Sequence, residues 1–443
     1  MPNAEFGTTQ IKLDLITGHA RRDGEFRFTS LHHLLNKDFL RGCFQCLDKK
    51  KAVGVDGITW EDYSKELESN LDKLISKIGR RAYKPLPSKR VYIPKNEHEK
   101  RPLGISAFET KIVESGVARI LRSIYEVDFL PCSYGFRPGQ CCHDALFALD
   151  QAIMYQPVNH IVECDIKGFF DAVSHEHLLN FLKIRIGDTA MLELIGKFLK
   201  AGFIDEGEFN ETDKGTPQGS ILSPLLSNVF LHYTLDKWFE DTVKFHMRGF
   251  AELIRYADDF VIAVQFKDDA KRIEQAVKNR FAKYALEIHP TKSRCISFGR
   301  FEKINAETQK RKPHTFDFLG FTHFCDKTRK GQFKVGRKTQ RKKFTKACKS
   351  VHEWLKKIRN QEKTKEWWRT LKAKLRGHYN YYGISGNYRS ITQFYVRTLY
   401  MTRYWMNRRS QKKNLTMEKF WKYLELYPLP KPEIKHDFYV RNV

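Results

Sequence analysis

Arg255-Tyr256-Ala257-Asp258-Asp259-Phe260-Val261 places two adjacent carboxylates between two apolar segments of the chain. Leu253-Ile254 before them and Phe260 to Val264 after them are β-rich and too short for helices, so they predict a hairpin with the aspartates at its tip. Neighbouring residues on a strand face opposite ways, and only the bend lets both carboxylates approach one site. An ordinary Asp-Asp turn between two strands is the alternative interpretation.

A third aspartate follows a second apolar segment. His160 to Asp165 predicts a buried strand, and Gly168 allows a tight departure from its end. Carboxylates held this close need a cation between them, because otherwise one stays protonated. Mg²⁺ or Mn²⁺, which favours carboxylate and phosphate oxygens, fits best. Five residues beyond Asp165, Phe170 is placed to present a ring beside the metal's ligand; a helix cap at Asp165 and a core position for Phe170 are the alternatives.

Two further segments favour phosphate chemistry. Arg90 to Lys95 and Arg101 to Ile105 predict a hairpin with Lys95 and Arg101 at its ends, able to hold a triphosphate, or a plain basic surface hairpin. Asp213 to Ser220 is a Gly/Pro loop before an apolar helix, and a helix N-terminus favours anions. Together with the aspartates, these segments predict a two-metal phosphoryl-transfer site.

The whole chain sets the limits for these local interpretations. Its 443 residues suggest two or three domains, with residues 1–30 as a loosely structured lead. No apolar run approaches the ~20 residues that span a bilayer. Met1 to Asp14 resembles no targeting peptide, so a cytoplasmic protein is expected. Nine cysteines, including a lone Cys43-Phe44-Gln45-Cys46, argue against a disulfide framework and against a zinc ribbon.

Positive charge is concentrated in the last third of the chain. Residues 301–443 hold 36 Lys and Arg against 11 Asp and Glu, a local excess of 25 within a net charge of +27. Five of the seven tryptophans lie there too: Trp354, Trp367, Trp368, Trp405 and Trp421. Interleaved cations and aromatic rings suit a polyanion with exposed bases, so we expect this region to bind nucleic acid.

The ordered set of motifs resembles the reverse transcriptases encoded by bacterial group II introns, also called intron maturases. The matching segments are, in order, Gly54-Val55-Asp56-Gly57 and residues 91–105, 133–139, 165–171, 215–226, 256–259, 289–292, 318–321, 376–382 and 408–411. Tyr256-Ala257-Asp258-Asp259 alone is a weak signal, whereas the ordered set is specific. The paired CxxC motifs of the zinc-bearing HNH endonuclease found in many family members are absent, so we expect no such domain before Val443.

The resemblance implies an α+β fold, a right-hand polymerase whose fingers and palm carry an antiparallel sheet, followed by an α-helical thumb. Residues 1–75 would form an N-terminal extension and the start of the fingers, residues 76–323 the fingers and palm, and residues 324–443 the helical thumb or maturase domain that binds RNA. The expected function is an RNA-directed DNA polymerase that copies RNA into cDNA and helps its intron RNA to splice and move.

The resemblance also implies roles for single residues. Asp165, Asp258 and Asp259 would be the catalytic ligands of two Mg²⁺ or Mn²⁺ ions. The residues expected to contact the incoming dNTP are Lys95, Arg101, Phe170 (against the 2′ position), Gln218 and Lys292. Arg376, Arg408 and Arg409 would bind RNA. The expected partners are an RNA template, a DNA primer, dNTPs and a structured intron or other non-coding RNA, in a bacterial cytoplasm and without a membrane.

Two alternatives remain open at this point. One is a domesticated relative that acts in phage defence or DNA repair, which flanking DNA without intron ribozyme domains would indicate. The other is an RNA-binding splicing factor with an idle polymerase, against which the intact aspartates argue. The RNA partner, the target DNA site, the priming mode and the oligomeric state do not follow from the sequence.

Overall fold

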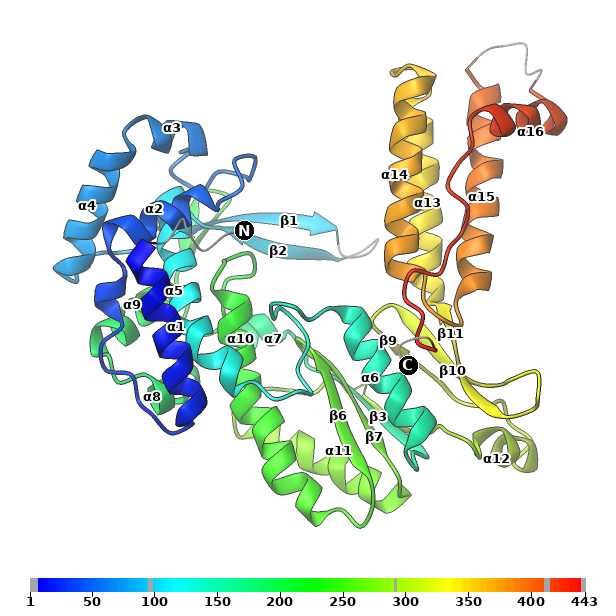
Figure 1. Ribbon diagram of the computed structural model, residues 1–443, viewed down its shortest axis with the longest axis horizontal. Coiled ribbons are helices and arrows are strands. Elements are labelled where there is room, and N and C mark those ends of the chain that lie inside the picture. Colours follow the sequence, from blue (N-terminus) through cyan, green and yellow to red (C-terminus); the bar gives the residue numbers. More distant parts are fainter. Residues whose placement is uncertain (1–6, 95–98, 291–292, 410–414, 440–443) are drawn as a thin grey trace.

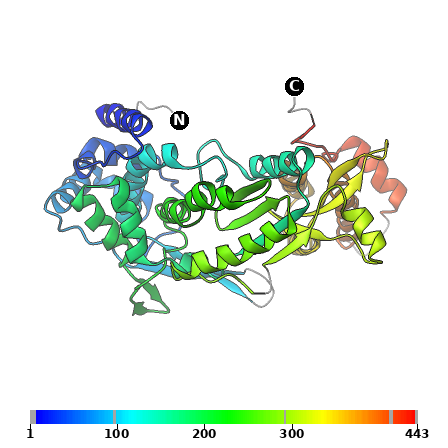
Figure 2. The same ribbon diagram turned by 90° about the horizontal axis from the view of Figure 1, so that it is seen from below.

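The computed structural model describes residues 7–94, 99–290, 293–409 and 415–439 (Figure 1). Its helices and three sheets confirm the mixed α+β class. The N-terminal helices lie at one end of an elongated molecule and the C-terminal helices at the other, with a sheet between them (Figure 2). Lys95 and Lys292, both expected at the site, lie outside the described residues.

Helices dominate the first part of the chain. They are α1 (Gly7–Arg22), η2 (His32–Leu34), α2 (Lys37–Gln45), α3 (Trp60–Lys65), α4 (Leu67–Gly79), α5 (Phe108–Asp128), α8 (His175–Arg185) and α9 (Thr189–Leu199). The expectation of a loosely structured lead over residues 1–30 is wrong, because α1 packs along α5. Leu13 and Ala20 are buried, whereas Ile11 and Leu15 are exposed. The apolar residues of α1 therefore do not follow one face, and the periodic signal is weak.

A four-stranded sheet, here called the hairpin sheet, contains the predicted basic hairpin. Its strands run in the order β2 (Lys100–Ile105), β1 (Ser88–Pro94), β4 (Phe203–Asp205), β5 (Glu208–Asn210). β1 and β2 pair antiparallel, with Ile93 opposite Arg101. The hairpin is confirmed, and Arg101 lies near its tip.

The central sheet carries the strands predicted around the aspartates. Its order is β6 (Ala251–Tyr256), β7 (Asp259–Val264), β3 (His160–Asp165), β8 (Arg294–Ser297), all antiparallel. One face packs through residues such as Leu253 and Phe260 into the core shared with α5 and with α10 (Ser223–Leu231), η3 (His232–Asp236), η4 (Phe239–Val243) and α11 (Lys267–Ala282). The other face, with Ile254 and Val261, packs on α6 (Cys142–Tyr155) and on the third sheet.

The third sheet joins the central sheet to the C-terminal helices. Its order is β11 (Phe333–Thr339), β10 (Phe321–Lys327), β9 (Thr315–Phe318), preceded by α12 (Glu302–Thr308). Residue 323, the expected end of the second domain, lies inside β10. Phe321 and Cys325 of this strand belong to the core on the central sheet. The C-terminal helices have their own core and are α13 (Arg341–Ile358), α14 (Thr364–Tyr382), α15 (Tyr388–Asn407) and α16 (Met417–Leu426).

Two global expectations concern membranes and disulfides. None of the helices in the described ranges is long and apolar enough to cross a bilayer. All nine cysteines are free thiols, with Cys43 buried and Cys46 exposed.

The third sheet contains a buried histidine with a testable effect on acid stability. His323 stacks on Phe316 with ring centroids 4.7 Å apart, and neither of its ring nitrogens has a hydrogen-bond partner among the described residues. Burial lowers the pKa of His323 to about 3. The unfolded chain takes up this proton below about pH 6.5, whereas the folded chain does not, so the free energy of unfolding falls as the pH drops below that value.

We predict that His323→Phe, which keeps the ring stacking, weakens this acid sensitivity. Urea unfolding at several values from about pH 7.5 down to about pH 5 measures it, since each pH unit below the unfolded pKa is worth about 1.4 kcal/mol for this group. An unchanged difference between the two ends of the range would show that His323 is not the group responsible.

Candidate active site

The turn between β6 and β7 is a tight hairpin connection that carries Asp258 at its tip. Tyr256 pairs with Asp259, so Ala257 and Asp258 form the turn, and Ala257 adopts a left-handed backbone with φ of 57°. Asp165 at the end of β3 lies directly opposite Asp259 on β7. Opposite residues of antiparallel strands have Cα atoms about 5 Å apart. The structure therefore brings together the three aspartates, here called the carboxylate cluster.

The carboxylate cluster is electrostatically strained in the absence of a cation. Desolvation by the surrounding protein, and then the negative charges of Asp258 and Asp165, raises the pKa of Asp259 to about 7, although Asp259 is exposed at the end of β7. Burial and the charge of Asp165 also raise the pKa of Asp258, while the positive charges of Arg101 and Arg255 lower it. Like charges this close favour a cation among them.

The donor set fits a hard divalent cation. Carboxylate oxygens are the ligands that Mg²⁺ and Mn²⁺ prefer. Within the described ranges, no group of three or more His, Cys, Asp or Glu side chains is placed so that it could hold a metal ion by itself. Mg²⁺ in phosphoryl-transfer sites is held by one or two carboxylates together with substrate phosphates and water, and an open cluster suits that mode.

Arg101 connects the hairpin sheet to the carboxylate cluster. It lies exposed on β2, and its charge acts on Asp258. The structure thus brings a cation predicted for a triphosphate to the side of the aspartates. Asp258 and Arg101 come from segments more than 150 positions apart in the sequence, and only the fold joins them.

The Gly/Pro loop predicted over residues 213–220 is bonded on two sides. The Gly104 amide of β2 donates to the Gln218 carbonyl at 2.6 Å, and the Thr216 amide donates to the Phe170 carbonyl at 2.6 Å. Gly219, with φ of 111°, lies so close to β2 that a Cβ would come 2.5 Å from the Gly104 oxygen. The loop therefore holds the hairpin sheet against the segment that follows Asp165.

Gln218 and Phe170 are both half-buried and lie in two segments that the loop joins by hydrogen bonds. Gln218 lines a cleft of 380 Å³ with Arg90, Phe203 and other residues of the hairpin sheet and the loop. Phe170, on α7 (Phe169–Ala172), is half-buried and packs edge-on against Phe169 at 5.5 Å. Its ring thus has a core contact as well as an accessible side.

The predicted tryptophan surface of the last third is largely wrong. Trp367, Trp368 and Trp405 are buried in the core of the C-terminal helices, and only Trp421 is nearly half exposed. Four helices that pack on one another need large apolar side chains at their contacts, and the tryptophans supply them. The tryptophans of this basic region therefore indicate a helical core.

Tyrosines form the exposed aromatic surface instead. On α15, Tyr388, Val396, Tyr400 and Tyr404 are each more than 40% exposed and recur every four or eight residues. This face, here called the tyrosine stripe, lies opposite the buried positions Ile391 and Thr398. Arg389 and Arg397 are exposed on the same helix. The four-residue spacing of these side chains is visible in the sequence. It could have predicted the stripe if the buried face of α15 had been identified first.

The predicted RNA-binding arginines are all exposed but differ in their contacts. Arg376 lies on α14, and Arg408 sits over the Tyr404 ring at 4.7 Å. Arg409 donates to the Thr364 hydroxyl at 2.6 Å and lies over Trp367, so it also ties α15 to α14. α13 adds seven further lysines and arginines in 18 residues.

Comparison with known proteins identifies the class. The family described as reverse transcriptase (RNA-dependent DNA polymerase) matches residues 93–323, just over half of the chain. This region contains β2 of the basic hairpin, the Gly/Pro loop and the carboxylate cluster. The chain belongs to the reverse transcriptase family, which implies a polymerase fold.

Its similar relatives include proteins named for introns. The group II intron-encoded protein LtrA of Lactococcus lactis subsp. cremoris is 38% identical over 232 residues, 52% of this chain and 38% of that protein. Protein YkfC of Escherichia coli is 33% identical over 240 residues, 48% of this chain and 63% of that protein. An uncharacterized 91 kDa protein in the cob intron of Schizosaccharomyces pombe is 33% identical over 208 residues, 47% of this chain and 25% of that protein. The chain spans less than two thirds of each relative's length.

The close approach of Gly219 to β2 gives a prediction. Gly219→Ala should push the loop from the hairpin sheet and lower the melting temperature, because the new Cβ meets the Gly104 carbonyl. Gly207→Ala is the matched control: Gly207 also has a positive φ, of 95°, but a Cβ there meets nothing within 4 Å. Thermal unfolding and hydrogen exchange of the β2 amides measure both variants. Equal effects would mean that backbone strain alone, without the contact, explains the loss.

Proposed function

We propose that the protein is an RNA-directed DNA polymerase of the group II intron type that also binds its intron RNA and assists splicing and mobility. Its architecture would be a right hand, with residues 1–75 as the N-terminal extension and start of the fingers, residues 76–323 as fingers and palm, and residues 324–443 as the RNA-binding thumb. One observation carries the polymerase role: Asp165 lies opposite Asp259, beside Asp258, and the charge of Arg101 from the hairpin sheet acts on Asp258.

The carboxylate cluster is the proposed catalytic centre. Asp165, Asp258 and Asp259 would hold two Mg²⁺ or Mn²⁺ ions, which supply Lewis-acid activation of a primer 3′-hydroxyl and charge neutralisation at the leaving pyrophosphate. The chain's own part is to keep the three carboxylates ionised and in place. The raised pKa of Asp259 supports the need for positive charge there, because an unpaired carboxylate at this position takes up a proton near neutral pH.

Residues around the cluster would select and orient the nucleotide. Arg101 is suited to the triphosphate, since its guanidinium is exposed and its charge reaches Asp258. Phe170 would present its accessible side below the sugar and exclude a 2′-hydroxyl, while Gln218 would contact the nucleotide from the bonded loop. Lys95 and Lys292 complete the proposed set.

The C-terminal helices are the proposed RNA surface. The tyrosine stripe offers rings for base stacking, and exposed cations, including Arg376, Arg408 and Arg409, offer phosphate contacts. The relative LtrA is named as a group II intron-encoded protein, which supports intron RNA as the partner. The two activities would therefore use different parts of one chain.

We predict that Asp258→Asn stops cDNA synthesis and leaves RNA binding and splicing assistance intact. The substitution keeps the shape of the side chain but removes a metal-binding charge, whereas RNA folding needs only the surface of the C-terminal helices. Primer extension on an RNA template and splicing with the flanking RNA, both run on the same purified variants, measure the two activities. Glu240→Gln removes the charge of Glu240 on η4, which forms an exposed ion pair with Lys244, and is the control that changes charge away from the site.

The results separate the parts of the proposal. Robust extension by Asp258→Asn would remove the assignment of the site. Extension by the wild type without any effect on splicing of its flanking RNA would leave a polymerase and reject the intron role.

We predict that Tyr400→Ala with Tyr404→Ala weakens RNA binding by about tenfold or more, because each stacked base is worth about 1–3 kcal/mol. Arg376→Ala with Arg408→Ala should instead flatten the salt dependence, by about 0.7–0.9 log units per log unit of salt for each lost contact. Filter binding across a salt series distinguishes the two effects. Phe245→Ala removes a ring that is 87% exposed outside the C-terminal helices and serves as the control. Equal losses in all three variants would contradict a specific surface.

A further inference from the structure

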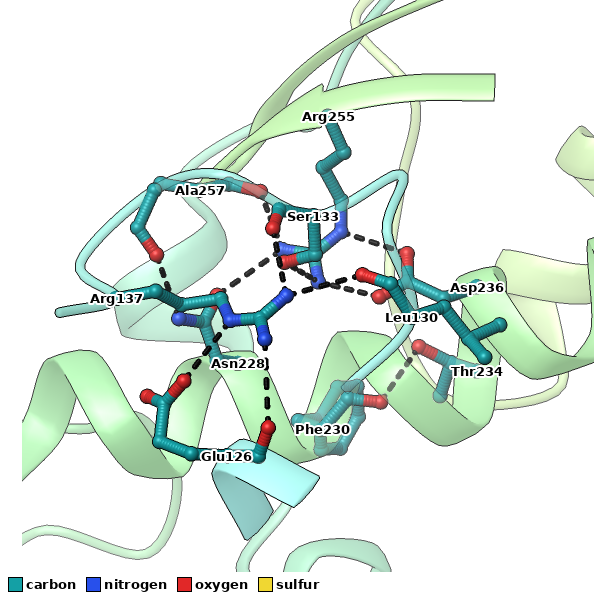
Figure 3. A network of polar contacts seen from close by, with 11 residues as sticks. Glu126, Leu130, Ser133, Arg137, Asn228, Phe230, Thr234, Asp236, Arg255 and Ala257 are labelled. Carbon is teal, nitrogen blue, oxygen red and sulfur yellow. Dashed lines mark hydrogen bonds and ion pairs between the residues drawn. The ribbon is translucent and has the colours of Figure 1, made fainter. Parts of the chain in front are cut away.

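Arg255 lies in the strand that leads into the catalytic turn and is completely buried. Its guanidinium uses all five of its N–H groups (Figure 3). Nε donates to Asp236 at 2.7 Å, and one Nη donates to the Asn228 side chain and to the Ala257 carbonyl, both at 3.0 Å. The other Nη donates to the Ser133 hydroxyl at 2.7 Å and to the second oxygen of Asp236.

The acceptors come from three separate segments. Asn228 lies on α10, and Asp236 lies on η3, a π-helical turn that continues α10. π-Helical turns in longer helices occur often at functional sites. Ser133 belongs to the loop after α5. The fourth acceptor, the carbonyl of Ala257, is part of the catalytic turn itself, directly before Asp258.

The loop that carries Ser133 also touches the turn with its backbone. The Arg255 amide donates to the Cys132 carbonyl at 2.8 Å, and the Tyr134 amide donates to the Arg255 carbonyl at 2.9 Å. A Cβ on Gly135 would lie 2.3 Å from the Ala257 nitrogen, so only glycine permits this approach. Asn228 donates to the Gly135 carbonyl at 2.7 Å, so the side chain that accepts from Arg255 is also bonded to the loop.

The same loop is anchored on its far side. Arg137 donates to the Glu126 carboxylate at 3.0 Å and to the carbonyls of Leu130 and Ser133 at 3.0 and 2.9 Å. The loop is thereby fixed to the end of α5 (Figure 3). The turn is thus connected through Arg255 to α10 and η3, and through the loop to α5.

We propose that Arg255 is a positioning residue for the metal site: by fixing the Ala257 carbonyl to Asp236, Asn228 and Ser133, it holds Asp258 at the spacing from Asp165 that binds the divalent cation. This inference rests on the proposed polymerase function. A left-handed backbone at Ala257 is sparsely populated for a residue with a side chain, and it persists only where its surroundings impose it. Arg255 and Gly135 are those surroundings.

A purely structural role makes a different prediction. Buried ion pairs contribute little net stability compared with apolar residues of similar volume, but removing one partner destabilises the fold. Arg185 provides the comparison, since it is 1% exposed and pairs with Asp128 at 3.0 Å in the N-terminal part of the protein. Arg185→Lys should therefore lower stability as Arg255→Lys does, yet only Arg255→Lys should change the metal site.

The test titrates Mn²⁺ into the full-length protein with primer–template and a non-hydrolysable dNTP analogue, and follows free Mn²⁺ by electron paramagnetic resonance. Groups that orient ligands without binding the metal change affinity by about 10–100-fold when altered. We expect Arg255→Lys to weaken Mn²⁺ binding within that range, and Arg185→Lys to match the wild type. Ser133→Ala, which removes one of the five bonds, should weaken binding by a smaller factor and decide the matter if Arg255→Lys does not fold.

Two outcomes overturn the inference. One is wild-type Mn²⁺ affinity in folded Arg255→Lys, or in Ser133→Ala if Arg255→Lys does not fold. The other is an equal loss of affinity in Arg185→Lys, which would report general destabilisation. Failure of the proposed function is separate, because it would appear as a wild-type protein that binds Mn²⁺ yet extends no primer.

Discussion

Mutual repulsion among three carboxylates is the constraint around which the structure is built. Asp165 and Asp259 are cross-strand neighbours at the ends of the two inner strands of the central sheet, and Asp258 lies in the adjoining turn. Nothing about folding alone favours this arrangement, since burial and neighbouring charge raise the pKa of Asp259 to about 7. The positive charges of Arg101 and Arg255 lower the pKa of Asp258 and so offset part of the repulsion. The remaining repulsion is what supports the proposal that a cation binds here.

Local patterns in the sequence were sufficient for the strands and turns that form this site. Short β-rich segments around Asp165 and Asp258-Asp259 predicted strands with the aspartates at their ends, and the register confirms both. The basic hairpin was predicted in the same way. Local pattern could not show that Arg101 acts on Asp258, because their proximity depends on the packing of the hairpin sheet against the central sheet through the loop around Gln218.

Patterns that depend on tertiary packing were interpreted less well. α1 was missed because its apolar residues do not lie on one face. The tryptophans of the last third were assigned to RNA, but composition cannot distinguish a ring that fills a helical core from one that faces solvent. The boundary predicted at residue 323 lies inside β10, a strand that also belongs to the core on the central sheet, and it stays a prediction. The errors at α1 and at the tryptophans came from inferring the environment of a residue from local pattern and residue type.

Arg255 shows how a residue inside the most informative motif can still be overlooked. In the sequence, this cation between Ile254 and Tyr256 only precedes the aspartates. In the structure, its buried side chain connects the turn that carries Asp258 to α10 and to the loop after α5. The motif at 133–139 had no assigned role in the sequence, and its backbone contact with Ala257 supplies one. The resemblance gives only the order of these motifs along the chain. In the structure, hydrogen bonds join the motif at 133–139 to the turn that follows Arg255. Such bonds explain why the ordered set of motifs includes segments without a reactive group, because these segments determine the positions of the reactive groups.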